Sequence, residues 1–327
     1  MYVLLIDQGR RLVTSDAQRL RLYDVEAAPP RLVAALEQPG ELPFFDQSPA
    51  GERIASAAGI IARSFTPLGA ATHWTETPTK VGLYAAADLA TIRVLEVGER
   101  LDHDSLALSP DGTQIVSVSR GGGLAVFDAT SGARLVSLDG DIASGTSASP
   151  DGRFVALGET DQGGGVLTLV ELQPAGGGGP IKHELPEPEY GSGLNDSPFC
   201  SRFTADGRHV VFTSAAWGSV GVVVYDVATR AELWSEGMDM VGDEEAESWP
   251  AAELELALDD ALVLVGQDGL VRAFRREGGE ALSPLEFEPG DSRHFAADSR
   301  RRGIWITREG EPQLVPFPRD WTADGTD

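Results

Sequence analysis

The sequence predicts an all-β fold assembled from repeated four-stranded units. Short apolar runs of about five residues alternate with turn signals along the chain, and the same order of runs and turns recurs. The 327 residues include 38 glycines and 20 prolines. This composition suits many tight turns and disfavours long helices, in which each interior glycine costs about 1 kcal/mol and each proline about 3 kcal/mol.

The clearest unit spans residues 106–138, LALSPDGTQIVSVSRGGGLAVFDATSGARLVSL. It holds four predicted strands, at 106–109, 114–119, 124–128 and 134–138. A Pro-Asp-Gly turn, a glycine-rich turn and a Ser-Gly turn separate them in that order. Four antiparallel strands in about 35–45 residues form one blade of a β-propeller. Packing such blades in a ring buries their faces and leaves only short edges exposed.

Seven units can be laid on this template, which predicts a seven-bladed propeller in a single domain, residues 1–319, with six or eight blades as the alternatives. The blades are expected at approximately 1–40, 41–99, 100–140, 141–186, 195–237, 250–288 and 291–319. The last blade lacks a clear fourth strand. Residues 320–327 are expected to form an acidic C-terminal tail.

The repeats resemble those of WD-repeat propellers. The stretches VGQDGLVRAF (265–274) and TSDAQRLRLYD (14–24) are similar to the hairpin between the second and third strands of that family, with Asp268 and Asp16 at the place of its turn aspartate. The closing Trp-Asp pair of the family is represented by Tyr23-Asp24, Phe127-Asp128 and Tyr225-Asp226. The SPDG turns also resemble bacterial Tol-type propeller repeats. The resemblance implies a propeller fold and a binding role, and it implies no enzymatic activity.

The chain is strongly acidic, with 26 Lys and Arg against 51 Asp and Glu and a net charge of −25. Such a charge disfavours nucleic acid and anionic membranes and favours a basic protein or peptide as partner. The alternative is that the charge only keeps the protein in solution. No signal peptide or membrane span is expected, because the apolar run at the N-terminus ends at Asp7. We therefore expect a cytoplasmic protein that is monomeric on its own. The single cysteine, Cys200, excludes an intrachain disulfide.

In a propeller, the first-to-second and third-to-fourth turns lie on one face, and the second-to-third turns and blade connections lie on the other. Insertions predicted at 63–80, 184–197, 214–221 and 236–250 all fall on the second face, whereas 173–180 is a flexible turn on the first. Their aromatic and acidic residues suit cation–π contacts and Arg–carboxylate pairing with a basic segment. The predicted partner-binding residues are His73, Trp74, Glu187, Glu189, Tyr190, Trp217, Asp243, Glu244, Glu245, Glu247 and Trp249.

Alternatives to this site remain. Trp74 and Trp249 would also suit a role in tethering their own loops, and 243–247 would also suit a solvated loop. No nucleophile elbow, phosphate loop, HExxH or CxxC motif is present, so neither a catalytic residue nor a cofactor or metal is expected. The alternative function is a lactonase-like hydrolase with a cation in the channel.

Acidic residues in three places are candidates for a cation site, and the first of these belongs to the hydrolase alternative. The channel candidates are Asp102, Asp104, Asp141 and Asp196, and Asp102-His103-Asp104 would also suit cation binding or acid–base chemistry at a blade junction. Asp239, Asp243, Glu244 and Glu247 would suit calcium, which takes several oxygen ligands, but they lack EF-hand spacing.

Overall fold

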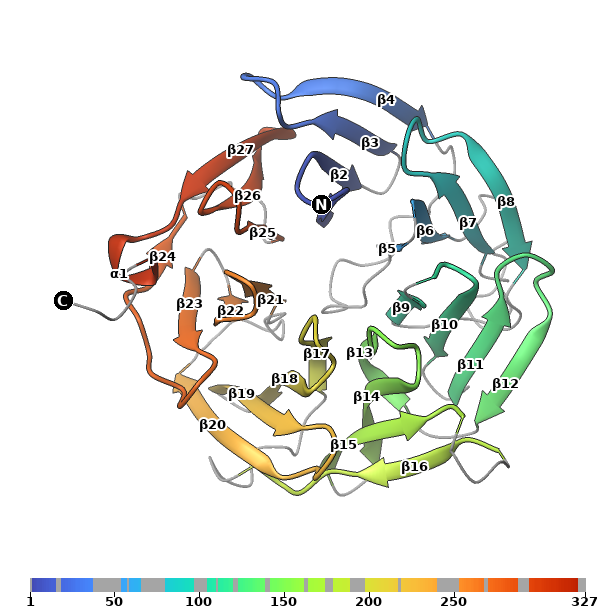
Figure 1. The fold of residues 1–327 in the computed structure, drawn as a ribbon, viewed down its shortest axis with the longest axis vertical. Coiled ribbons are helices and arrows are strands. Elements are labelled where there is room, and N and C mark those ends of the chain that lie inside the picture. The colour runs from blue at the N-terminus through green and yellow to red at the C-terminus, as the bar shows by residue number, and fades with distance from the viewer. Residues whose placement is uncertain are drawn as a thin grey trace.

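The computed structural model is a ring of seven β-sheets around a central channel (Figure 1). The described residues are 2–15, 19–37, 54–57, 59–65, 80–96, 105–109, 111–119, 123–138, 142–161, 164–173, 179–188, 198–216, 219–239, 253–267, 270–287 and 294–322. The sheets are antiparallel, and six of them have four strands in simple sequence order. The prediction of an all-β, seven-bladed propeller is confirmed.

Each blade runs outward from an innermost strand beside the channel (Figure 1). The strands of blades 1 to 3 are β1 (Tyr2–Ile6), β2 (Arg11–Ser15), β3 (Arg19–Asp24), β4 (Arg31–Glu37), β5 (Ile54–Ala57), β6 (Ile60–Phe65), β7 (Lys80–Ala85), β8 (Thr91–Glu96), β9 (Ser105–Leu108), β10 (Gln114–Ser119), β11 (Gly123–Asp128) and β12 (Arg134–Leu138). Blades 4 and 5 contain β13 (Ile142–Ala148), β14 (Phe154–Asp161), β15 (Gly164–Glu171), β16 (Ile181–Glu184), β17 (Pro198–Phe203), β18 (His209–Ala216), β19 (Ser219–Asp226) and β20 (Glu232–Asp239). Blades 6 and 7 contain β21 (Glu253–Ala257), β22 (Leu262–Gln267), β23 (Leu270–Arg275), β24 (Leu285–Glu286), β25 (Ala296–Asp298), β26 (Gly303–Arg308) and β27 (Glu311–Pro316).

Successive side chains of a strand point to opposite sides of their blade, so the core is divided among the seven blade junctions. Adjacent residues Leu12 and Val13 of β2, both fully buried, face opposite neighbours: Leu12 packs toward Trp305 of blade 7 and Val13 toward Ile61 of blade 2. One hydrophobic cluster of this kind fills each of the seven junctions. Burial between blades, at roughly 25 cal/mol per Å² of apolar surface, therefore holds the ring together.

Strand direction defines two faces. Neighbouring strands are antiparallel, so the first-to-second and third-to-fourth turns of every blade lie together on what we call the turn face. The second-to-third turns and the blade connections lie on the opposite side, the connection face. On the turn face, the third-to-fourth turn of blade 3 spans only residues 129–133. The assignment of turns to faces made from the sequence therefore follows from the observed strand order.

Three of the predicted insertions are shorter than expected. In blade 5, β18 continues to Ala216 and β19 starts at Ser219, with Ala215 paired to Val220, so most of 214–221 is sheet. Strand β20 likewise extends through 236–239, and β6 continues to Phe65. In blade 5 the prediction was wrong because the ladder extends through alanine, glycine, glutamate and aspartate, which carry a weak strand signal. In blade 2 the ladder extends through Arg63 and Ser64, which break the apolar run.

Blade 7 closes the ring with three described strands, in agreement with the unclear fourth strand of the sequence. Residues 319–322, most of which were expected in an acidic tail, form the short helix α1 (Arg319–Thr322). Trp321 is 1% exposed and donates from Nε1 to the carbonyl of Ser283 in blade 6 at 2.7 Å. Among the described helices, none is long and apolar enough to cross a membrane. The C-terminal helix therefore fastens blade 7 to blade 6.

The outer edge of β27 is poor in hydrogen-bond donors. The N–H of Phe317 donates to the carbonyl of Arg302 at 2.8 Å, and pairing alternates along an antiparallel ladder. Pro312, Leu314 and Pro316 therefore point their backbone groups away from β26. Two of these three residues lack an N–H, so the edge resists the addition of another strand.

Candidate functional site

A repeated turn shapes the turn face in blades 3, 4 and 5. In blade 3, the Ser109 hydroxyl donates to Asp111 Oδ1 at 2.6 Å and accepts the N–H of Gln114 at 2.9 Å. Ser149 with Asp151 and Thr204 with Asp206 make the same hydroxyl–carboxylate contact. The following glycine adopts a positive φ in all three turns, as tight turns of this kind require. Rigid, minimal turns therefore border the channel on this face.

Hydrogen bonding keeps the turn aspartates ionised. The Ser109 hydroxyl and then the N–H and hydroxyl of Thr113 lower the pKa of Asp111 to about 2. The Thr204 hydroxyl, followed by the N–H of Arg208, likewise holds the pKa of Asp206 below its usual range. These carboxylates stabilise their own turns, and they add negative charge to the turn face at neutral pH.

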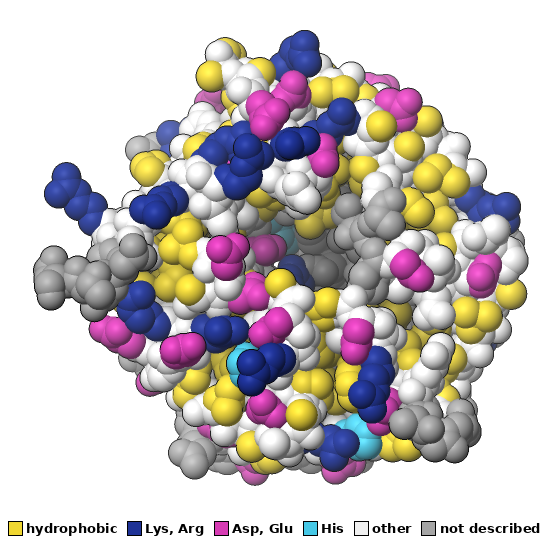
Figure 2. Space-filling view, viewed as in Figure 1, with side chains coloured by type: hydrophobic (Ala, Val, Ile, Leu, Met, Phe, Trp, Pro, Cys, Tyr) yellow, Lys and Arg dark blue, Asp and Glu magenta, His cyan; other side chains and the backbone are white. Residues whose placement is uncertain are grey.

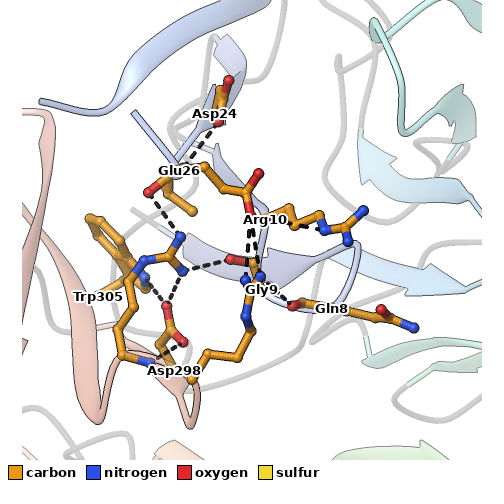
Figure 3. Close-up of polar contacts among 10 residues, drawn as sticks. Gln8, Gly9, Arg10, Asp24, Glu26, Asp298 and Trp305 are labelled. Carbon is orange, nitrogen blue, oxygen red and sulfur yellow. Dashed lines mark hydrogen bonds and ion pairs between the residues drawn. The ribbon is translucent and has the colours of Figure 1, made fainter. Parts of the chain in front are cut away.

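A polar network on the turn face holds the junction between blades 7 and 1 (Figure 3). Asp298 is fully buried and accepts from Trp305 Nε1 at 2.9 Å and from Arg301 Nη1 at 2.7 Å. Arg301 also donates to the carbonyls of Gly9 at 2.7 Å and Val25 at 3.0 Å in blade 1. The guanidinium therefore connects the last blade to the first, and we call this set of residues the closing network.

Arginines gather around the closing network on the surface. Arg300 Nη2 lies 3.4 Å and Arg10 Nε 3.9 Å from the same Glu26 oxygen, and all three side chains are about half exposed. Arg302 follows in the same turn as Arg300 and is exposed. Figure 2 shows dark-blue Lys and Arg side chains clustered over β2, β3 and β26, beside the channel mouth. A protein of net charge −25 thus carries a local basic surface.

The channel wall of blades 5 to 7 carries charged side chains that are paired with one another. Arg202 of β17 lies 3.4 Å from Glu255 of β21, with side chains 22% and 23% exposed. Glu253 accepts the N–H of Phe295 at 3.0 Å and contacts the imidazole of His294. Within the described ranges, no three His, Cys, Asp or Glu side chains are grouped closely enough to hold a metal ion.

The predicted partner-binding residues lie mostly outside the described residues. Glu187 is described: it is exposed and lies just beyond β16, where the connection to blade 5 begins on the connection face. The hydroxyl of Tyr225 donates to the carbonyl of the preceding Pro186 and anchors this connection. The predicted residues outside the described part are His73, Trp74, Glu189, Tyr190, Trp217, Asp243, Glu244, Glu245, Glu247 and Trp249, and so are the channel candidates Asp102, Asp104, Asp141 and Asp196.

The sequence interpretation missed the closing network and its surrounding arginines. The signal was present in DSRRRG at 298–303, the densest run of arginines in the chain. This run of arginines does not reveal the network without the fold, because its partners Gly9, Val25 and Glu26 lie more than 270 positions away in the sequence. Only the closing of the ring brings the two ends of the chain together.

Comparison with known proteins supports the fold. A chain of Kuenenia stuttgartiensis hydrazine synthase is similar, with a TM-score of 0.64 and 11% identity over 97% of this chain and 95% of that one. The β-propeller domain of Myceliophteria thermophila Cps50 (Swd1) has a TM-score of 0.46 and 12% identity over 84% of this chain and 99% of that one. No protein-family model and no curated protein matches the sequence. The similarity to the hydrazine synthase chain supports the fold alone. The resemblances to WD-repeat propellers and to Tol-type repeats stay predictions.

Proposed function

We propose that this propeller is a non-catalytic interaction scaffold that binds a basic protein or peptide segment on its connection face. The observation that carries the proposal is the combination of strand order and charge. Three of the long segments, those between β6 and β7, β16 and β17, and β20 and β21, begin and end at one face. By sequence they contain the predicted aromatic residues Trp74, Tyr190 and Trp249, and the last of them contains four carboxylates within 243–247, in a chain of net charge −25.

Physical chemistry supports a basic partner for such a surface. Carboxylates pair with guanidinium groups in bidentate geometry, and the faces of tryptophan and tyrosine attract cations. A net negative field also accelerates the encounter with a basic segment and suppresses acidic competitors. Glu187, exposed next to the anchored Pro186, is the described member of the predicted surface.

The test uses a fluorescein-labelled oligolysine peptide and fluorescence anisotropy. Replacing Asp243, Glu244, Glu245 and Glu247 by their amides is expected to weaken binding by about tenfold or more, since each exposed pair contributes up to about 1 kcal/mol. Raising the salt concentration is expected to weaken the wild-type complex as well, because exposed charges are screened over about 8 Å at physiological ionic strength. Chelation with EDTA is expected to change nothing.

A matched control separates this surface from bulk charge. Asp7→Asn, Asp259→Asn and Glu277→Gln neutralise exposed carboxylates on the turn face. Asparagine suits the positive φ of the two aspartates. Equal losses per removed charge in the two sets of variants would show that the peptide responds to net charge alone. Binding that requires a divalent cation, or turnover of lactones, would favour the hydrolase alternative.

A further inference from the structure

The basic surface at the junction of blades 7 and 1 differs from the first-to-second turns of blades 3 to 6. The first-to-second turns of blades 3 and 6 contain aspartates and no arginine, and those of blades 4 and 5 contain one of each. The first-to-second turns of blades 1 and 7, residues 7–10 and 299–302, together contain four arginines and one carboxylate. The arginines are Arg10, Arg300, Arg301 and Arg302, the carboxylate is Asp7, and Glu26 and Asp298 lie beside them.

Part of this charge is used by the fold, and part is not. Arg301 is occupied by Asp298 and by the carbonyls of Gly9 and Val25 in blade 1. Arg10 and Arg300 share the single carboxylate of Glu26, and their side chains remain 56% and 52% exposed. One shared carboxylate neutralises only one of two guanidiniums. Three exposed guanidiniums, those of Arg10, Arg300 and Arg302, therefore stand against two exposed carboxylates, Asp7 and Glu26, and the surface keeps a small excess of positive charge facing solvent.

We propose that this surface, the closing-junction arginines Arg10, Arg300 and Arg302, is a second docking site, which takes an acidic peptide segment of a partner protein. Guanidinium groups present forked donors that match carboxylates in bidentate geometry. One Glu26 oxygen lies 3.4 Å from Arg300 Nη2 and 3.9 Å from Arg10 Nε, so the two guanidiniums already converge on a carboxylate. The surface lies on the turn face, opposite to the proposed site for a basic segment.

The overall charge of the chain favours a peptide over nucleic acid. A nucleic acid presents a continuous line of phosphates and would meet the other carboxylates of a chain with net charge −25. A short acidic segment contacts the arginines alone. Aspartates such as Asp111 and Asp206 elsewhere on the turn face repel anions and would restrict such a segment to this junction.

The test compares residues that hold the same position in different blades. Arg10, Arg208 and Arg302 each precede the second strand of their blade, and the carbonyl of each accepts an N–H that follows its third strand. The double variant Arg10→Gln with Arg302→Gln removes two positive charges from the junction. The control variant Arg208→Gln removes one positive charge from blade 5. A fluorescein-labelled oligoglutamate peptide is titrated at low salt. We expect the double variant to bind about tenfold more weakly and the Arg208 variant to change by less than about twofold.

Other outcomes of these binding measurements would overturn the proposal. Absence of oligoglutamate binding to the wild type, or equal losses per charge in the junction and Arg208 variants, would overturn it. Tighter binding of a single-stranded DNA oligonucleotide, lost in the same double variant, would overturn the acidic-peptide assignment. If the double variant unfolds, Arg302→Glu alone, a change on an exposed side chain, is compared with Arg208→Glu. Oligolysine binding should be unaffected by any of these changes, so this proposal and the proposed function fail separately.

Discussion

Asp298 is the residue on which the closing network depends. Its carboxylate is fully buried and accepts hydrogen bonds from Trp305 Nε1, from the Arg301 guanidinium and from the Arg301 N–H at 3.0 Å. Removing one partner of a buried ion pair leaves the other charge uncompensated, which costs far more than the pair contributes. Asp298 therefore fixes the guanidinium that joins blade 7 to blade 1.

We predict that Asp298→Ala lowers the free energy of unfolding by about 3 kcal/mol, measured by urea denaturation. The control is Arg300→Ala in the same turn, whose ion pair is exposed and should contribute less than about 1 kcal/mol. Similar small effects of both substitutions would mean that the apolar contacts at this junction hold the ring without the closing network.

Asp111 gives the residue-scale prediction for pH. Its folded pKa of about 2 lies below its ordinary value of 3.8, so its stabilisation is complete above about pH 4 and is lost as the pH falls toward 2. Ser109→Ala removes the largest cause of the shift and should raise the pKa of Asp111 toward 3.8. A carboxyl NMR titration of both proteins measures this directly. An unchanged pKa in the variant would assign the shift to Thr113 and the backbone instead.

At the scale of elements, blade 3 could be predicted almost to the residue from the sequence. Its predicted strand at 114–119 is β10, and its fourth strand at 134–138 is β12. Short apolar runs bounded by Pro-Asp-Gly and Ser-Gly are informative because the turn residues mark both ends of each strand. The hairpin of blade 5 was less predictable, because its ladder continues through Ala215 and Ala216 and leaves little sign in the sequence.

The C-terminal helix could not be predicted, for a different reason. The sequence PRDWTADGTD contains one large apolar residue, Trp321, and a single residue has no periodicity. Its burial depends on Ser283, Leu282 and Leu285 in the preceding blade. The Asp320 carboxylate adds a second contact, since it accepts the N–H of Ser283 at 2.7 Å. The helix compensates for the fourth strand that the described part of blade 7 lacks.

Truncation tests this role. A chain ending at Pro318 loses α1 and should be destabilised by about 3 kcal/mol, the cost typical of removing a buried tryptophan. A chain ending at Thr322 keeps the helix and serves as the control, with the stability of the full chain. Urea denaturation followed by circular dichroism measures both. Equal stabilities of the two truncated chains would show that α1 does not fasten blade 7.

At the scale of the whole molecule, the ring was predictable and the surfaces were predictable only in part. Repetition along the chain is visible without a structure, and seven repeats imply seven junctions, each of which contains its hydrophobic cluster. Net charge is equally visible, but its distribution is not, since Arg10 and Arg300 meet only when the ring closes. An acidic chain can therefore carry a basic surface that its composition conceals.

We propose above that a basic segment binds the connection face. The most direct measurement is photo-crosslinking of a benzophenone-bearing oligolysine peptide to the wild-type protein, with the crosslinked residues located by mass spectrometry. We predict crosslinks around Glu187 and in the segments 66–79 and 240–252, and their loss at high salt. Crosslinks concentrated on the turn face, or spread evenly over both faces, would contradict the proposed function.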